Sequence, residues 1–302
     1  MEVDHVETVG GLLREWRHGR QLSQLDLALA AGVSPRYVSL VETGRSRPSA
    51  DMVLRLAAQL EVPLRHRNRL LVAAGFAPRY RERPLDEPDM AAVRDAVLRV
   101  LRAHEPYPAL VMDGRWNVLM TNAPVDHFLA EVDPELLAAP LNMVRLGLDP
   151  RGLASRIVNL AEVRTVLRAR LSRQIARTGD PVVAALYDEF FAADGPEGPA
   201  RSGGSEGARP PLESEVATPM IFRFREGELS LFSTITTFGT PQDITLDEIS
   251  IESYYPSDAA GAALLRGLAD ARGRGVGAGW DTAGHGRIQP EGGPSPLSAS
   301  RS

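Results

Sequence analysis

The chain has 302 residues, of which 43% are hydrophobic and 24% are charged, a composition typical of a globular protein with room for two domains. It contains no cysteine, which excludes disulfides, thiolate nucleophiles and cysteine-based metal sites. No apolar run approaches the roughly 18 to 20 residues that span a bilayer. The first ten residues also lack the pattern of a signal peptide, so we expect a cytoplasmic protein that makes no membrane contact.

The formal net charge of -5 is divided unevenly along the chain. Residues 1–83 contain 13 Arg and 9 acidic residues, whereas the remainder contains 21 Arg and 30 acidic residues. The N-terminal part is therefore net positive, which favours contact with a polyanion such as DNA. The chain contains no Lys, which GC-rich coding explains better than selection for binding.

The first 76 residues predict five short helices. The first is expected over residues 9–18, and the fourth and fifth over residues 50–60 and 64–74. Between them, Ser23 and Asp26 form the pattern of a capping box, and Gly32 would end that second helix in a left-handed conformation. Ser34 would cap the third helix, with Pro35 as its first residue.

The third helix has an unusual outer face. Its buried stripe leaves four residues pointing outward, namely Arg36, Tyr37, Ser39 and Leu40. A generic helical hairpin is the alternative interpretation. The whole segment from "LSQLDLALAAGVSPRYVSLVETGRSRPS" to Leu60 nevertheless closely resembles the λ-repressor-like helix-turn-helix of the XRE family, over about residues 9–60.

The resemblance implies a DNA contact for seven residues. Arg36 and Ser39 would reach base edges in the major groove. The others would meet phosphates or the DNA backbone, and they are Gln24, Ser34, Tyr37, Arg45 and Arg47. Gln24 would also support the third helix, and Glu42 would bond the protein backbone or an arginine and fix the turn that follows.

A Pro-rich linker is expected over residues 77–90. Six arginines precede or lie in it, namely Arg65, Arg67, Arg69, Arg79, Arg81 and Arg83. They could contact the DNA backbone, remain solvated or pair with the acidic second domain, and these alternatives stay open.

A second domain of the α+β class is expected over residues 91–268. A helical stripe runs from Val93 to Leu101, and Asp113-Gly114 marks a hairpin between strands 109–112 and 116–121. Asn122 would cap a helix through Phe128. A hairpin followed by a capped helix resembles the start of a PAS-like sensor domain.

The remainder of this domain predicts helices around residues 160–171 and two strands within residues 226–239 and 244–256, which gives an antiparallel sheet with helices packed across it. With "YPALVMDGRWNVLMTNAP" and "RIVNLAEV", these runs resemble the ligand-binding domain of the MmyB-like regulators over about residues 84–266. Residues 195–211 and 269–302 are rich in Gly, Pro and Ser and are expected to be a disordered insertion and tail.

The MmyB-like resemblance implies a PAS-like fold with a pocket for a small, apolar, fatty-acid-like ligand. Six residues could form its walls, namely Trp116, Leu119, Phe128, Leu160, Phe190 and Phe232. Four could anchor a head group, namely Asn142, Arg145, Arg156 and Asn159. For any one of these ten, a place in the core or on the surface is the competing interpretation.

Enzymatic motifs are missing from the sequence. It has no GxSxG elbow, Walker loop or HExxH, and its six His are scattered, so we expect neither an enzyme nor a cofactor or metal site. The hypothesis is a dimeric, sequence-specific transcription regulator on an inverted repeat of double-stranded DNA, controlled by the apolar ligand. The alternative is a helix-turn-helix adaptor or antitoxin-like module that binds no ligand.

Overall fold

The computed structural model describes residues 8–194, 219–225, 227–273, 280–281 and 286–287. They form two compact units. The first draws on residues 1–84, 167–199 and 237–249, and the second on residues 85–166, 200–236 and 250–302. Two segments expected in the ligand-binding domain are therefore grouped with the N-terminal helices.

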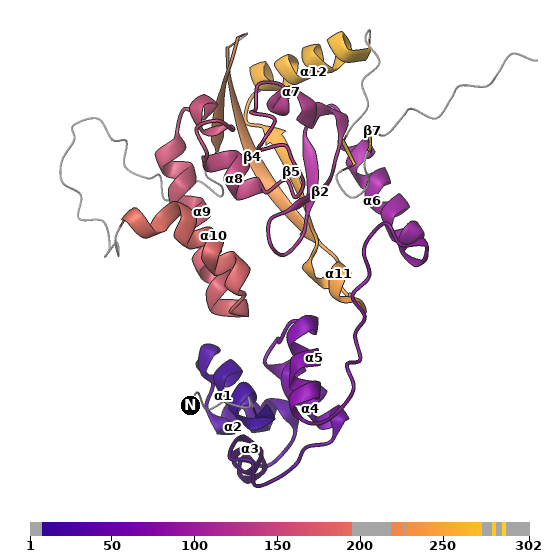
Figure 1. Ribbon diagram of the computed structural model, residues 1–302, viewed down its shortest axis with the longest axis vertical. Coiled ribbons are helices and arrows are strands. Elements are labelled where there is room, and N and C mark those ends of the chain that lie inside the picture. Colours follow the sequence, from indigo (N-terminus) through magenta and orange to yellow (C-terminus); the bar gives the residue numbers. More distant parts are fainter. Residues whose placement is uncertain (1–7, 195–218, 226, 274–279, 282–285, 288–302) are drawn as a thin grey trace, which may run out of the picture. The chain divides into compact units, whose positions relative to one another are not determined.

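Five helices open the first unit (Figure 1). They are α1 (Val9–Gly19), α2 (Gln24–Ala31), α3 (Pro35–Glu42), α4 (Ala50–Gln59) and α5 (Leu64–Ala73). Their ends are those the sequence predicts. Ser23 and Asp26 make both bonds of the capping box, and Gly32 ends α2 with φ 63°. The Ser34 side chain accepts from the backbone N–H of Tyr37, with Pro35 at the start of α3.

These helices enclose one apolar core. Its members include Leu13 of α1, Leu27 of α2, Val38 of α3 and Leu56 of α4, and each of these residues is 1% exposed. Gly10 of α1 lets two helix backbones approach closely, because a Cβ there would lie 2.3 Å from the carbonyl oxygen of Val41. The core thereby fixes how α3 is held against α1.

The first unit also contains α10 (Pro181–Phe191) and the short α11 (Ile244–Glu248), and α11 is bonded to the beginning of α5. Asp247 Oδ2 accepts from the backbone N–H of Leu64 over 2.8 Å. Glu248 Oε1 accepts from Arg65 Nε over 2.7 Å, and the pKa of Arg65 is raised by its bonds to Glu248 and Glu82. The first turn of α5 is therefore bonded to two acidic residues of α11.

The linker is bonded to the same short helix. Arg83 Nε donates to Asp243 Oδ2 over 2.8 Å, and the Asp243 side chain is 2% exposed. The backbone N–H of Ile244 donates to the Arg81 carbonyl over 2.8 Å. Of the interpretations left open for the six arginines, pairing with acidic residues from the C-terminal half is confirmed for Arg65 and Arg83.

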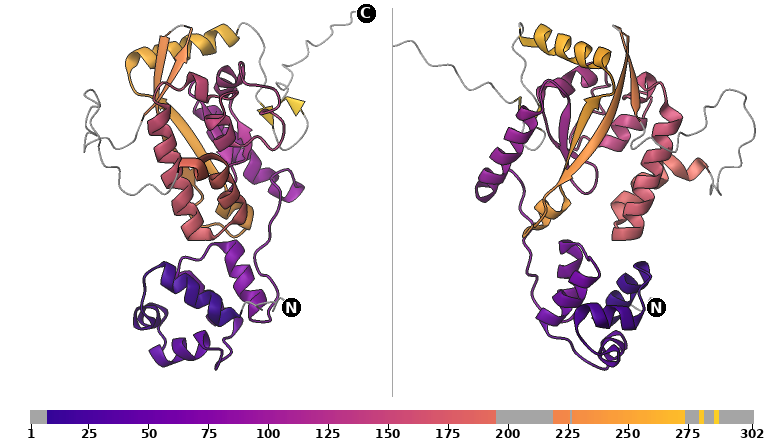
Figure 2. Two further views of the ribbon diagram at one scale, coloured as in Figure 1. Left: turned by 60° about the vertical axis from the view of Figure 1, so that its left-hand side comes forward. Right: turned by 180° about the vertical axis from the view of Figure 1, so that it is seen from behind.

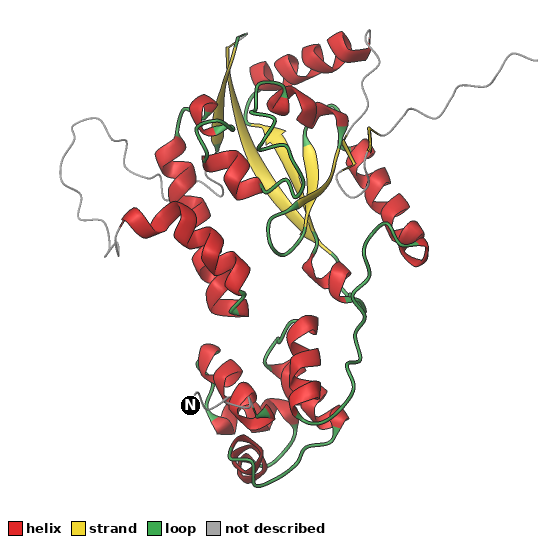
Figure 3. Ribbon diagram, viewed as in Figure 1, coloured by secondary structure: helices red, strands yellow, loops and turns green. Residues whose placement is uncertain are grey.

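The second unit is a mixed domain of helices and an antiparallel sheet (Figure 3). Its helices are η1 (Pro88–Met90), α6 (Ala91–Ala103), η2 (Ala123–Val125), α7 (Asp126–Leu129), α8 (Met143–Leu148), η3 (Ala154–Arg156) and α12 (Ala259–Gly273), and α9 (Leu160–Thr178) begins in it. Its strands are β1 (Ala109–Met112), β2 (Val118–Thr121), β3 (Met220–Phe224), β4 (Gly227–Thr237), β5 (Ser250–Pro256), β6 (Trp280–Asp281) and β7 (Gly286–Arg287). The fold class expected from the sequence, a five-helix domain followed by an α+β domain, is confirmed.

The seven strands follow the order β3-β4-β5-β1-β2-β6-β7. Every pair with a described register is antiparallel, for example Leu110 opposite Thr121 in β1 and β2 and Leu110 opposite Glu252 in β1 and β5. In both views of Figure 2, α12 lies at the same end of the sheet as the β3–β4 hairpin. A Cβ at Gly261 of α12 would lie 2.9 Å from Leu229 Cδ1 of β4, so this glycine permits a close approach.

The β1–β2 hairpin differs in detail from the prediction. Trp116 lies in the turn with φ 67°, and β2 begins at Val118 rather than at residue 116. Asn122 precedes the helical segment as expected, but its side chain makes no capping bond. Asn122 Oδ1 instead accepts from the backbone N–H of Ala109 over 2.8 Å, and its Nδ2 donates to the carbonyl of Tyr107.

Two strand expectations also change. Residues 244–248 form α11 instead of the beginning of a strand, because Asp243 caps this helix through the backbone N–H of Thr245. Strand β3 was not anticipated. Val100, which was expected on the apolar stripe between Val93 and Leu101, is exposed.

The chain beyond residue 268 contains more secondary structure than expected for a disordered tail. Helix α12 continues to Gly273, and β6 pairs with β2 through Asp281 and Met120. The expected insertion at 195–211 and the rest of the tail lie outside the described residues.

Candidate DNA-binding surface and ligand site

Helix α3 presents the residues expected to read bases. Arg36 is exposed, and Ser39 and Leu40 are half-buried. Tyr37 differs from the prediction, because it is half-buried and packs against the helical core instead of pointing fully outward. Its ring therefore contributes to packing, and a phosphate contact would have to come from its exposed part.

Glu42 at the end of α3 bonds two other helices. Glu42 Oε1 accepts from Arg17 Nε over 2.6 Å, and Oε2 accepts from Gln24 Nε2 over 2.8 Å. Burial alone would raise the pKa of Glu42, but the bonds from Arg17 and Gln24 outweigh it and hold that pKa below its usual value. The internal bond expected from Glu42 to an arginine is confirmed, and so is the support that Gln24 gives to α3.

The turn after α3 carries two exposed arginines, Arg45 and Arg47. Gly44 adopts φ 71°, and the backbone N–H of Arg45 donates to the Leu40 carbonyl over 2.8 Å. The turn is thus fixed by backbone bonds to the last turn of α3. Both guanidinium groups are carried on the same ordered segment as Arg36.

An apolar cavity of about 40 Å³ lies inside the second unit. Phe128 of α7 and Phe222 of β3 line it. The other lining residues are Pro108, Leu110, Val125, Leu129, Met143, Leu146, Leu153, Met220, Leu231 and Tyr254. The cavity is smaller than the roughly 300–1,000 Å³ of most ligand pockets, so a ligand with a long apolar tail would have to move some of these side chains.

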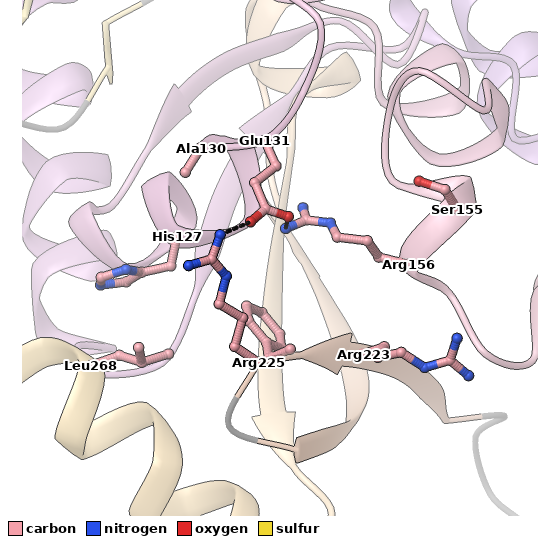
Figure 4. Close-up of a pocket in the computed structure, with 9 residues that line it drawn as sticks. His127, Ala130, Glu131, Ser155, Arg156, Arg223, Arg225 and Leu268 are labelled. Atoms are coloured by element: carbon pink, nitrogen blue, oxygen red, sulfur yellow. Dashed lines mark ion pairs between the residues drawn. The ribbon is translucent and has the colours of Figure 1, made fainter.

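A wider cleft of about 430 Å³ lies beside the β3–β4 hairpin. It is lined by three arginines, Arg156, Arg223 and Arg225, with Glu131, His127, Ala130, Ser155, Phe224 and Leu268. Figure 4 shows Arg156 and Arg225 pointing toward Glu131 and Arg223 directed away from it. The Arg223 guanidinium lies 4.0 Å from Glu228.

The backbone around Arg156 explains its position in this cleft. Arg156 ends η3, and the next residues pair along the edge of β3, where the backbone N–H of Val158 donates to the Ile221 carbonyl over 2.8 Å. Its guanidinium carbon lies 5.9 Å from the centre of the Phe224 ring, and Nη2 donates to the Phe128 carbonyl. Burial lowers the pKa of Arg156, and Glu131 opposes this effect.

Three phenylalanines join the cavity to the cleft. The Phe128 ring lies 5.1 Å from Phe222 and 5.3 Å from Phe224, both edge to face. Phe128 and Phe222 line the apolar cavity, whereas Phe224 lines the arginine cleft. We call these three residues the aromatic cluster.

Two of the ten residues expected at the ligand site line one of these spaces. Phe128 lines the cavity, and Arg156 lines the cleft. The other eight, Trp116, Leu119, Asn142, Arg145, Asn159, Leu160, Phe190 and Phe232, line neither of the two. Several of them hold the fold instead. Asn142 caps α8, Asn159 Oδ1 accepts from the backbone N–H of Ile221, and Phe232 stacks on Tyr255 at 5.3 Å.

Sequence reasoning missed most of the walls, including Leu110, Met220, Phe222 and Tyr254, and it missed the two cleft arginines Arg223 and Arg225. Most of these lie on β3 and its turn. The run "MIFRFR" alternates apolar residues with arginine, which is the signal of a strand with two different faces.

Comparison with known proteins identifies both the N-terminal helical domain and the domain that contains the cavity and the cleft. A family model described as the MmyB-like transcription regulator ligand binding domain matches residues 93–268, more than half of the chain. The chain belongs to this MmyB-like family. A helix-turn-helix model also matches residues 13–66, which include Arg36 of α3 and the turn with Arg45 and Arg47.

Individual proteins that are similar to this MmyB-like chain include two regulators. An uncharacterized HTH-type transcriptional regulator RghRB of Bacillus subtilis (strain 168) is 29% identical over 130 residues, which cover 43% of this chain and 85% of that protein. The solved structure of the clp gene regulator ClgR from Corynebacterium glutamicum is 26% identical and covers 33% of this chain and 94% of its own, with a TM-score of 0.21.

The helix-turn-helix and the MmyB-like domain together make this protein a DNA-binding transcription regulator with a ligand-binding domain. Across the described parts of the chain, no three His, Asp or Glu side chains gather as they would around a metal ion. Within the same residues, none of the helices is both long enough and apolar enough to cross a membrane.

Proposed function

We propose that this regulator reads a specific DNA sequence as a dimer on an inverted repeat and is controlled by a small apolar ligand with an anionic head, such as a fatty acid. Arg36 and Ser39 read bases. Ser34, Tyr37, Gln24, Arg45 and Arg47 contact the DNA backbone. The PAS-like domain binds the ligand and contributes to the dimer.

One observation carries the ligand assignment, namely that the apolar cavity and the arginine cleft meet at the aromatic cluster. A fatty-acid-like molecule has the same two parts. Its carboxylate would bond Arg156, and its tail would enter the cavity once Phe128 and Phe224 rotate. Charge-assisted bonds between guanidinium and carboxylate are among the stronger polar contacts in proteins.

Decanoate binding to the full chain tests the ligand proposal. Arg156→Gln should weaken binding at least about tenfold, because one charge-assisted bond contributes roughly 1.5–3 kcal/mol. Arg145→Gln is the control, since this exposed arginine of α8 lies outside the cleft. Equal loss in both variants, or no binding of decanoate by the wild type, would count against the proposal. Native mass spectrometry of protein purified from cells should also show a lipid-sized adduct.

Selection from a random DNA library tests the base-reading proposal. The wild type should enrich a sequence with inverted half-sites, and the double variant Arg36→Ala, Ser39→Ala should lose that preference. Arg45→Ala and Arg47→Ala should weaken binding to all sequences and each lower the salt slope by about one. Recovery of the same sequence by the double variant would contradict the assignment. A chain that bound no DNA at low salt would favour the adaptor alternative.

A further inference from the structure

Glu131 lies between two arginines of the cleft. Its Oε2 is 3.6 Å from Arg156 Nη1, and its Oε1 is 4.0 Å from Arg225 Nη2 (Figure 4). One carboxylate is therefore shared between two guanidinium groups that come from different segments of the chain, η3 and the β3–β4 hairpin.

Neither ion pair is tight. Both distances exceed the roughly 2.7–2.9 Å of a charge-assisted hydrogen bond. The Glu131 side chain is 58% exposed and that of Arg225 is 91% exposed, so water competes for both groups. Such exposed pairs contribute little to stability. Separating Glu131 from Arg225 therefore costs the fold little, and an anion that replaces Glu131 beside Arg156 keeps that guanidinium paired.

Arg156 is in a different situation, because its side chain is only 15% exposed. Burial lowers its pKa, and the nearest carboxylate compensates this effect from 3.6 Å. A buried guanidinium gains more from a close carboxylate than an exposed one does, since water screens it less. The position beside Arg156 therefore favours an anion that can approach more closely than Glu131 does.

We propose that Glu131 occupies the head-group position of the ligand and acts as a tethered competitor that an amphipathic anion must displace. This inference rests on the function proposed above. A small anion such as acetate gains only its closer approach to Arg156, and it must displace Glu131 to do so. An anion with an apolar tail gains further free energy when that tail is buried behind the aromatic cluster. Glu131 thus makes the site selective for anions that carry a tail, because its carboxylate repels an incoming anion that gains nothing from burying a tail.

Substitution of Glu131 separates this role from a structural one. In the full chain, Glu131→Gln should bind decanoate about fivefold more tightly than the wild type, the upper end of the range for a loose ion pair with one exposed partner. Binding of decanol, which has the same chain length without the charge, should be unchanged. Glu135→Gln is the matched control, because Glu135 is a nearby exposed carboxylate that pairs with Arg151 outside the cleft.

The outcomes distinguish this inference from the function on which it rests. Tighter decanoate binding by Glu131→Gln alone, with decanol unaffected, supports the competitor role. If Arg156→Gln weakens decanoate binding but Glu131→Gln leaves it unchanged or weaker, the ligand proposal stands and the competitor role is wrong. If neither the wild type nor Glu131→Gln binds decanoate, both are wrong.

Discussion

Arg17 of α1 and Glu42 of α3 form a buried ion pair, with 2.6 Å between Nε and Oε1 and with the Glu42 side chain 2% exposed. Arg17 Nη1 also donates to the Leu22 carbonyl over 2.7 Å. Three segments of the helix-turn-helix therefore meet at one carboxylate, since Gln24 of α2 bonds it as well. The pair fixes the orientation of the helix that carries Arg36.

Replacing Glu42 by Ala should destabilise the N-terminal unit by about 3–5 kcal/mol, because it leaves the buried guanidinium of Arg17 without its carboxylate. Chemical denaturation with hydrogen exchange of α1 and α3 measures the loss. The control is Asp51→Asn, which breaks the exposed pair between Asp51 and Arg79 at 3.4 Å and should change stability by less than about 1 kcal/mol. Similar losses in the two variants would show that Glu42 is not a structural centre.

His66 makes the stability of the first unit depend on pH. Burial, followed by the charges of Arg69 and Arg65, lowers the pKa of His66 below its usual value of 6.5. The ring lies 5.2 Å from Trp16, edge to face. The unfolded chain therefore binds a proton more readily than the folded one, so stability present above about pH 6.5 is lost as the pH falls below it.

The measurement is the melting temperature at pH 7.5 and pH 5.5. His66→Gln should lose less on acidification than the wild type does, because Gln does not titrate. His18→Gln, a substitution of an exposed histidine in α1, serves as the comparison. A wild-type and a His66→Gln protein with the same pH dependence would contradict the assignment.

Gly10 and Gly19 offer a matched pair within α1. A Cβ at Gly10 would lie 2.3 Å from the Val41 carbonyl oxygen and 2.8 Å from that of Glu42, whereas nothing lies within 4 Å at Gly19. Gly10→Ala should destabilise by about 1–3 kcal/mol through overpacking. Gly19→Ala should be neutral or stabilise by up to about 1 kcal/mol through helix propensity. Thermal unfolding decides this, and a stable Gly10→Ala variant would show that α1 and α3 are packed less closely.

Asp243 holds α11 to the linker. Its side chain accepts from Arg83 Nε over 2.8 Å and from the backbone N–H of Thr245 over 2.9 Å. Asp243→Ala should speed hydrogen exchange in both α11 and residues 81–83. Asp258→Ala removes the bond to Gly261 at the start of α12 and should affect that helix alone. Unchanged exchange at residues 81–83 in the Asp243 variant would contradict the described bonding.

Local sequence chemistry predicts the N-terminal unit well, because its helix ends depend on neighbouring residues. The capping bonds of Ser23 and Ser34 span three residues, and the left-handed Gly32 needs no distant partner. The same reasoning fails where a side chain bonds far along the chain. Asn122 looks like a cap, but its amide is used by Ala109 and Tyr107, a contact that local sequence does not encode.

The candidate ligand site was harder to predict for the same reason. Phe128 and Arg156 were expected because the family resemblance indicated the kind of site. Phe222 and Phe224 come to Phe128 from a strand almost a hundred residues away, and only the packing of β3 beside η3 brings them together. Asn142 and Asn159 have side chains that could anchor a head group, but both use them to hold the fold. Asn142 caps α8, and Asn159 bonds the backbone of β3.

The most direct test of the account is the affinity of the full chain for its selected DNA duplex, measured by fluorescence anisotropy with and without decanoate. Ligand control requires unequal affinity for two states, so decanoate should change the DNA dissociation constant at least about fivefold in the wild type. Arg156→Gln should bind the DNA normally without decanoate and show no such change. A DNA affinity that decanoate leaves unaltered in the wild type, at concentrations that saturate the ligand site, would contradict the account.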